Sequence, residues 1–243
     1  MLITSVNNEH IKEIIKLKEK KYRDKENKFI VEGEHLVLEA FRAGLVDELI
    51  LEQDTVFPLN VDDITYVSFD IIKKISDLES PSKVMAVVRK KKEEKILEKV
   101  LMLDNIQDPG NLGTIIRSAL AFDIDTIILS LDSVDLYNPK VIRATQGMIF
   151  HLNIVRRDLK EAIDTLKSEG YKIVGTKVTS GKDVKTAKIY SHFALIMGNE
   201  GSGVKEELLK CCDEYLYIKT SDKVESLNVA VATSILIYEI YNK

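Results

Sequence analysis

A short stretch at residues 196–204, IMGNEGSGV, sets a single acid among glycines after an apolar run. The glycine spacing G-x-x-G-x-G differs from the G-x-G-x-x-G of a dinucleotide-binding fold, and no Lys-Ser or Lys-Thr pair follows as a phosphate loop requires. Glycines after a strand let the backbone approach a ligand closely. The stretch therefore indicates a ligand-binding turn in which Glu200 is either a site residue or an acid on a surface loop.

A second stretch, DPGNLGTIIRSALAF at residues 108–122, has polar residues where a strand gives way to a helix. We expect a turn at residues 108–110 and a helix from about Asn111, which would serve as its cap. Arg117 follows among apolar residues, and the helix dipole does not favour a cation so near the start of a helix. Arg117 is therefore either a site residue or a surface arginine held by an ion pair.

The third stretch, IKTSDKVESLNVAVA at residues 218–232, runs from a strand through a polar loop into an apolar helix. Ser226 is expected to cap this helix, with Asn228 in its first turn. A buried Asn228 needs a hydrogen-bond partner to offset its desolvation, either in the local backbone or in a site. Because ligands of open α/β sheets bind beyond the carboxyl ends of the strands, all three stretches are candidates for one site.

The composition limits the kind of protein that these stretches belong to. The 243 residues suffice for one large domain or two ordinary ones, and 45% are hydrophobic. A net charge of −4 gives no overall attraction to nucleic acid, so RNA binding would require a local basic patch. The adjacent Cys211 and Cys212 indicate reduced thiols, and because the first residues contain no long apolar run we expect no signal peptide. We expect a soluble cytoplasmic protein without a membrane segment or a metal site.

A charged run at residues 89–99, RKKKEEKILEK, marks the strongest change in composition. It predicts a first domain at residues 1–90, a linker at 91–99 and a second domain at 100–243. The first part reads as a small α/β module that opens with a helix near residues 8–27. Its further elements are strands at 28–33, 46–52, 64–68 and 83–88 and helices at 34–44 and 69–77.

The second part alternates apolar strands with amphipathic helices, a pattern that favours a parallel sheet covered on both faces. The last helix, at residues 226–243, is apolar nearly all round, which indicates either a deep core position or a subunit interface. The remaining expected strands lie at 99–106, 125–130, 150–155, 171–178, 193–200 and 214–220, and the helices at 111–122, 139–147, 158–169 and 204–212.

Taken together and in this order, the three stretches resemble the motifs of the SpoU/TrmH family of RNA ribose 2′-O-methyltransferases in the SPOUT superfamily. The stretch KYRDKENKFIVEGEHLVLEA at residues 21–40 is similar to the substrate-binding module of many members. The resemblance implies an α/β protein whose C-terminal parallel-sheet domain forms a trefoil knot, behind a small N-terminal α/β domain that binds the substrate. It also implies S-adenosylmethionine as the cofactor and a homodimer.

Roles follow from the matched positions. The resemblance implies catalytic roles for Asn111, Arg117, Glu200, Ser226 and Asn228, and contacts to S-adenosylmethionine from Thr176, Gly198, Ile218 and Leu227. Two departures stand out, since Lys219 and Thr220 replace the Pro-Met that often follows Ile218, and Asp123 replaces a glycine after the first motif. They put in doubt the rigidity of the third loop and the local turn after the helix, without removing a matched polar residue.

We hypothesise that Arg117 binds a phosphate or the developing 2′-alkoxide and that Glu200 orients Arg117 or the loop. An arginine pKa above about 12 makes Arg117 a poor general base. RNA affinity is expected from the lysine-rich first helix, with a solvated lysine face as the alternative. The candidates are Lys12, Lys16, Lys18, Lys20, Lys21, Arg23, Lys25 and Lys28.

The N-terminal module favours ribosomal over transfer RNA, because tRNA-directed relatives often lack it; this is an analogy of fold. Alternatives are a tRNA 2′-O-methyltransferase, a base methyltransferase of a related knotted family, and an RNA-binding protein that keeps the fold without catalysis. Binding of S-adenosylmethionine separates the last of these from the enzymes, and the position of the methyl group separates the enzymes from one another.

Overall fold

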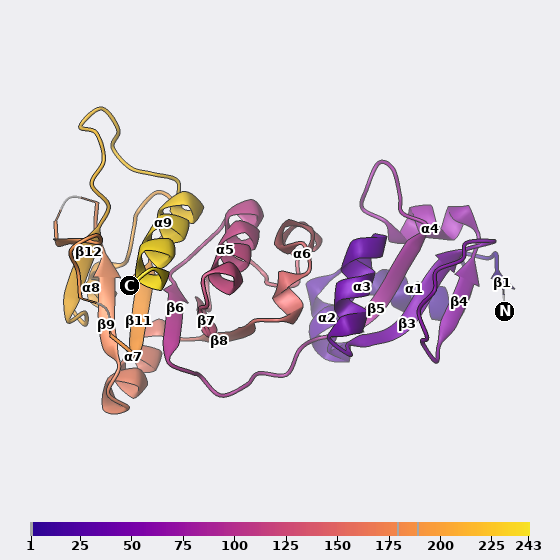
Figure 1. Cartoon of the computed structure of the whole chain (residues 1–243). Helices are drawn as coiled ribbons and strands as arrows, with labels where there is room; N and C mark the ends of the chain where they lie inside the picture. The colour runs from indigo at the N-terminus through magenta and orange to yellow at the C-terminus, as the bar shows by residue number, and fades with distance from the viewer. Residues whose placement is uncertain (1, 179, 189) are drawn as a thin grey trace. The chain divides into compact units, whose positions relative to one another are not determined.

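The computed structural model describes residues 2–178, 180–188 and 190–243, and the chain forms two compact units (Figure 1). The first unit contains the residues up to Lys92 together with Asp135–Phe150. The second contains Glu93–Val134 and His151–Lys243. Each unit has its own sheet and its own core.

The first unit is built on a five-stranded mixed sheet in the order β1-β4-β3-β5-β2. Strand β5 runs antiparallel to β2 and β3, whereas β4 runs parallel to both β1 and β3. Apolar side chains of helices α1 and α4 pack against this sheet. The strands are β1 (Leu2–Ile3), β2 (Lys28–Glu32), β3 (Val46–Glu52), β4 (Ile64–Val67) and β5 (Val84–Arg89), and the helices are α1 (Glu9–Lys16), α2 (Lys20–Glu26), α3 (Glu34–Arg42) and α4 (Phe69–Ile75).

The single helix expected near residues 8–27 is in fact two helices, α1 and α2. The chain breaks between them because Arg23 of α2 folds back onto the end of α1. Its guanidinium donates to the carbonyls of Leu17 at 3.0 Å and Lys18 at 2.6 Å. Arg23 is only 5% exposed, so the expectation that it contacts RNA was wrong. Its guanidinium binds groups of the first unit and is not available to RNA.

The segment Asp135–Phe150 packs with the first unit, although the boundary expected near residue 90 assigned it to the second domain. It contains α6 (Pro139–Thr145) and a 3₁₀ turn at Met148–Phe150. Asp135 binds the buried Arg23 at 2.6 Å, and Tyr137 and Phe150 place their rings 4.7 and 6.3 Å from that of Phe29. A periodic pattern locates such a helix in the sequence but does not show which core it joins.

The second unit contains a parallel sheet in the order β10-β12-β9-β11-β6-β7-β8. The central strands β6, β7 and β11 are buried along nearly their whole length, which explains their continuous apolar sequences. The strands are β6 (Lys99–Leu103), β7 (Thr126–Ser130), β8 (Asn153–Arg157), β9 (Lys172–Thr176), β10 (Lys182–Asp183), β11 (Phe193–Met197) and β12 (Glu214–Tyr217). The short strands β1 and β10 were not expected from the sequence.

Helices cover both faces of this sheet. The crossover β6–α5–β7 moves along the sheet in one direction and β8–α7–β9 in the other, so right-handed crossovers place α5 and α7 on opposite faces. Alternate side chains of β6 and β11, such as Met102 and Ile196, pack in the core under α7. The helices are α5 (Pro109–Ala121), α7 (Leu159–Ser168), α8 (Glu206–Leu209) and α9 (Val229–Tyr241).

The last helix, α9, packs against α5 (Figure 1). Between the two helices, the hydroxyl oxygens of Ser118 and Ser234 lie 2.7 Å apart. This supports the expected α/β architecture. The knot implied by the resemblance stays a prediction, because strand order alone does not trace the threading of the chain.

The buried ion pair of the first unit yields a prediction. Replacing Asp135 with alanine leaves Arg23 buried and unpaired, and the unfolding free energy of this unit should fall by about 3 kcal/mol. Urea unfolding of the full chain, followed by amide exchange in β2 and β5, measures the loss. The control is Asp24→Ala, which removes an exposed acid paired with Lys20 and Lys90 and should cost less than about 1 kcal/mol. Equal losses would show that the Arg23 pair does not hold the segment.

Candidate active site

The three polar stretches meet at the carboxyl edge of the parallel sheet. Strands β12, β9, β11 and β6 are neighbours and run parallel, so the loops that follow them leave the same edge. The side chain of Asn228 donates to Asn111 Oδ1 at 2.9 Å, and Asn111 Nδ2 donates to Glu200 at 3.0 Å. One hydrogen-bonded chain thus joins residues from all three stretches.

Glu200 is the acceptor at one end of this chain. Besides Asn111, it accepts the backbone N–H groups of Gln107 at 3.4 Å and Asp108 at 3.2 Å. Partial burial opposes ionisation, but these hydrogen bonds outweigh it and hold the pKa of the Glu200 carboxyl below its ordinary value. Glu200 is therefore an ionised anchor of the loop after β6.

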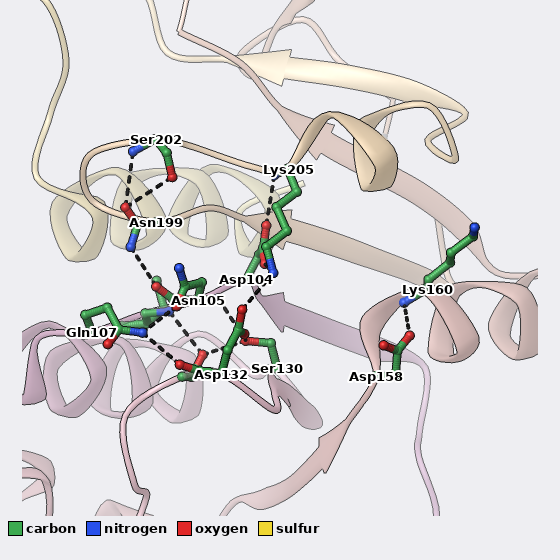
Figure 2. Close-up of polar contacts among 12 residues, drawn as sticks. Asp104, Asn105, Gln107, Ser130, Asp132, Asp158, Lys160, Asn199, Ser202 and Lys205 are labelled. Atoms are coloured by element: carbon green, nitrogen blue, oxygen red, sulfur yellow. Dashed lines mark hydrogen bonds and ion pairs between the residues drawn. The ribbon is translucent and has the colours of Figure 1, made fainter.

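The glycine turn at residues 198–204 closes on itself. Asn199 and Gly203 exchange two backbone hydrogen bonds of 3.0 Å, and Asn199 Oδ1 accepts from Gly201 and Ser202 (Figure 2). A Cβ on Gly198 would lie 2.0 Å from the backbone carbon of Gly203, and Gly203 has a φ of +71°. The glycine at 198 is thus required by the return of the loop itself, in addition to any ligand it admits.

Two expected helix caps were wrong. Helix α5 begins at Pro109 and is capped by Asp108, whose Oδ1 accepts the N–H of Asn111 at 2.7 Å. Helix α9 is capped by Asn228, whose Oδ1 accepts the N–H groups of Ala230 and Val231, and not by Ser226. The Asp-Pro pair was a usable signal, since proline favours the first helical position and aspartate the cap before it.

These caps decide which polar groups are free. With Asp108 as the cap, both polar atoms of the Asn111 side chain serve the link between Glu200 and Asn228. Ser226 is exposed, and its hydroxyl makes no hydrogen bond to another residue that the structure describes. The structure therefore joins three of the five expected polar residues and leaves Ser226 and Arg117 outside their hydrogen-bonded chain.

Arg117 lies on the exposed surface of α5, contrary to the core-facing environment suggested by its neighbours. Within the described part of the chain it makes no hydrogen bond or ion pair. Six residues of helix separate it from Asn111, which amounts to roughly 9 Å along the axis. The guanidinium is thus available to a ligand, and Glu200 does not orient it.

Three of the residues expected around the cofactor lie at the ends of β9, β11 and β12, and the fourth, Leu227, lies just before α9. Thr176 ends β9, and its hydroxyl donates to the carbonyl of Ile196 at 2.8 Å. Among the described residues, the backbone groups of Gly198, Ile218 and Leu227 form no hydrogen bond, although Gly198 is buried and the other two are half-buried. Such unpaired backbone donors and acceptors fit the largely backbone contacts expected for the adenosine part of S-adenosylmethionine.

The expected RNA-binding lysines of the first unit differ in availability. Lys18 binds Asp77 at 2.7 Å and Lys28 binds Asp47 at 2.5 Å, while Lys20 pairs with Asp24. Lys21 is exposed and lies 5.7 Å from the ring of Tyr22, and Lys16 is similarly placed at 5.9 Å. Lys12 and Lys25 pair with the neighbouring Glu9 and Glu26.

Two further searches cover the part of the chain that the structure describes. No helix there has the length and apolar sequence needed to cross a membrane. No group of three or more histidine, cysteine or acidic side chains is arranged to hold a metal ion in those residues.

Comparisons with known proteins agree with this geometry. Residues 98–238 match the SpoU rRNA Methylase family, and residues 8–86 match the MRM3-like substrate binding domain. The chain is 41% identical to the 23S rRNA (guanosine(2553)-2′-O)-methyltransferase RlmP of Bacillus subtilis (strain 168), over 98% of both chains. An rRNA methyltransferase from Sinorhizobium meliloti has a similar structure, with a TM-score of 0.88, 28% identity and coverage of 100% of this chain and 97% of that one. Its AdoMet-bound form gives the same values.

The chain therefore belongs to the SpoU rRNA methylase family. Its N-terminal unit contains a substrate-binding domain of the MRM3-like type. As the three motifs implied, it is an S-adenosylmethionine-dependent RNA ribose 2′-O-methyltransferase.

The glycine turn yields a prediction. In Gly198→Ala, the new Cβ cannot coexist with the backbone of Gly203, so the turn must open and binding of S-adenosylmethionine should weaken by about tenfold or more. Isothermal calorimetry measures the affinity. Gly201→Ala is the matched control, because its Cβ would meet only Asn199 Oδ1 at 3.6 Å and it should bind as the wild type does. Equal affinity of the two variants would contradict the assignment of this turn to the cofactor site.

Proposed function

We propose that this protein methylates the 2′-oxygen of a guanosine in 23S ribosomal RNA, at the position equivalent to the one in the name of the Bacillus subtilis relative. The supporting observation is the chain Asn228–Asn111–Glu200, which joins the family's three motifs in one site. The identity of 41% over 98% of both chains favours the same substrate. A ribosomal substrate also favours a cytoplasmic location.

The roles of the residues follow from the geometry. When bound, S-adenosylmethionine would supply an activated methyl group for the ribose 2′-oxygen, and the proton of the 2′-hydroxyl would pass to solvent. The backbone of Gly198, Ile218 and Leu227 would hold the cofactor, and Thr176 would close that part of the site. Asn111 and Asn228 would orient the ribose, with Ser226 free to contact it from the loop before α9.

Glu200 and Arg117 would have different electrostatic roles. Glu200 holds the loop after β6 and, being ionised and bonded to several donors, acts through Asn111 and not as a base. Arg117 has no partner in the described chain and would bind an RNA phosphate or the developing negative charge. In the first unit, the exposed Lys16 and Lys21 lie beside the half-buried ring of Tyr22, and this basic and aromatic cluster is suited to RNA.

A homodimer is part of the proposal. The outward side of α9 carries Val231, Tyr238 and Tyr241, which are 48%, 50% and 56% exposed. Their spacing places them on one stripe of the helix, and this stripe borders the contact with α5, because the rings of Tyr238 and Tyr241 lie 5.4 and 6.1 Å from that of Phe122. A second copy of the chain would cover this stripe, which explains why the sequence of α9 is apolar nearly all round.

The substrate assignment is tested by supplying methyl-labelled S-adenosylmethionine with 23S rRNA or with total tRNA. We expect label in 23S rRNA alone, at a ribose whose 3′-phosphodiester resists alkaline cleavage. Label in tRNA would reject the rRNA assignment. Cofactor binding without transfer to either RNA would favour a non-catalytic RNA-binding protein.

The role of Arg117 makes a separate prediction. Arg117→Ala should bind S-adenosylmethionine as tightly as the wild type, because no cofactor contact is assigned to it, while kcat falls by about a hundredfold or more. Arg157→Ala is the control, since it removes an exposed arginine of the same unit that pairs with Glu93. Methyl transfer near the wild-type rate in Arg117→Ala would show that the guanidinium does not act on the substrate.

The dimer has its own test. Tyr238→Glu places a charge in the apolar stripe and should raise the dimer dissociation constant by about 30-fold or more in analytical ultracentrifugation. Phe69→Glu alters an equally exposed aromatic residue of the first unit and should leave the constant unchanged. A wild-type protein that sediments as a monomer at micromolar concentration would contradict the proposal.

A further inference from the structure

A buried carboxylate lies beneath the end of the glycine turn. Asp104 follows β6 and is 1% exposed. Its Oδ2 accepts the backbone N–H of Lys205 at 2.9 Å, and its Oδ1 lies 3.4 Å from the ammonium of the same lysine. Asp104 also donates its own N–H to the carbonyl of Met197 at 2.9 Å. The acid is therefore attached to both sides of the turn at residues 198–204.

The ammonium of Lys205 extends this contact to the loop after β7. It donates to Asp132 at 2.7 Å, and Ser130 donates to the same carboxylate at 2.6 Å (Figure 2). The hydrogen bond to Asp132 raises the pKa of Lys205 above its ordinary value, while partial burial opposes this. Hydrogen bonds from Lys205 and Ser130 lower the pKa of Asp132. Both groups are thus charged at neutral pH.

From Asp132 the contacts lead back to the candidate active site. The carbonyl of Asp132 accepts Gln107 Nε2 at 2.8 Å, and the backbone N–H of Gln107 donates to Glu200. A parallel path runs through Asn105, whose N–H donates to Ser130 Oγ and whose carbonyl accepts Asn199 Nδ2, both at 2.8 Å (Figure 2). The turn is consequently tied to the loops after β6 and β7 at both of its ends.

We infer that Lys205 is a positioning residue for methyl transfer, acting through Asp104 and Asp132 to fix the turn that carries Gly198 and Glu200. The inference rests on the proposed function, since the turn is assigned there to the cofactor and to Asn111. Lys205 touches neither Asn111 nor the expected cofactor residues directly. Its effect on the reaction is the geometry that it imposes on the turn.

The same region provides a matched control. A cavity of about 210 Å³ is lined by Asp104, Asp132 and Lys205 on one side and by Asp158 and Lys160 on the other. Lys160 is exposed, its backbone N–H donates to Asp158 at 2.9 Å, and its ammonium makes no hydrogen bond or ion pair with another residue that the structure describes (Figure 2). Loss of its charge changes the electrostatics of the cavity without touching the turn.

The test compares Lys205→Met with Lys160→Met in the full chain. We expect Lys205→Met to bind S-adenosylmethionine about tenfold more weakly in calorimetry and to lower kcat by at least about as much, because small displacements of positioned groups are costly. The KM for RNA should stay within about twofold, since the turn is not assigned to RNA affinity. Lys160→Met should match the wild type in all three quantities. Equal cofactor affinity of the two variants would overturn the inference.

Two further variants separate positioning from stability. Lys205→Arg keeps the bridging charge and should recover most of the cofactor affinity. Asp104→Asn combined with Lys205→Met removes the uncompensated buried charge, so its melting temperature should return toward the wild-type value while cofactor affinity stays low. If affinity returns together with the melting temperature, Lys205 is merely structural. Calorimetry needs no RNA, so an incorrect RNA substrate would leave this result standing.

Discussion

The side-chain amide of Asn111 connects two loops, each of which lies roughly a hundred residues from Asn111 in the sequence. An amide offers a donor and an acceptor at once, so Asn111 can give a hydrogen bond to Glu200 and receive one from Asn228. A carboxylate at this position would repel Glu200, and a hydroxyl could not span the two partners with the same fixed geometry. The link also depends on Asp108, which caps α5 and leaves the Asn111 side chain free.

The sequence predicts the second unit well because its strands are short apolar runs between amphipathic helices, a pattern with few competing interpretations. The expected strands at 125–130 and 193–200 correspond to β7 and β11, and the convergence of three stretches at one edge follows from their parallel order. The order and separation of the motifs identified the family, which the periodicity alone could not identify. In this unit the pattern and the packing favour the same structure.

Prediction failed where a long-range partner decides a local choice. Residues 8–27 have the period of one helix, but the buried Arg23 binds the end of α1 and breaks it. Arg23 itself looked like part of a basic patch because its partner, Asp135, lies more than a hundred residues away. The caps expected at Asn111 and Ser226 were wrong for a related reason. Several residues near each helix start could serve as the cap, and only the path of the chain selects one of them.

The charged groups of the site favour catalysis by positioning of the reactants over catalysis by a carboxylate base. Glu200 and Asp132 each receive several hydrogen bonds that lower their pKa values, so both remain ionised acceptors at neutral pH and are poorly suited to take a proton. This is compatible with a donor whose methyl group is already activated, because the main requirement is to hold the acceptor oxygen in line. The net charge of −4 leaves RNA binding to local basic groups.

The position of Arg117 bears on which of its two proposed roles is favoured, binding of an RNA phosphate or binding of the developing 2′-alkoxide. Relative to Asn111 it lies about 9 Å further along α5 and roughly 120° around the helix axis. A ribose oriented by Asn111 and Asn228 would thus have its 2′-oxygen near the start of the helix, whereas the guanidinium is directed to a different part of the surface. Within one copy of the chain, the geometry favours contact with a phosphate flanking the target nucleotide over contact with the reacting oxygen. Arg117 would then contribute by fixing the RNA backbone, for which a planar guanidinium with several donors is well suited.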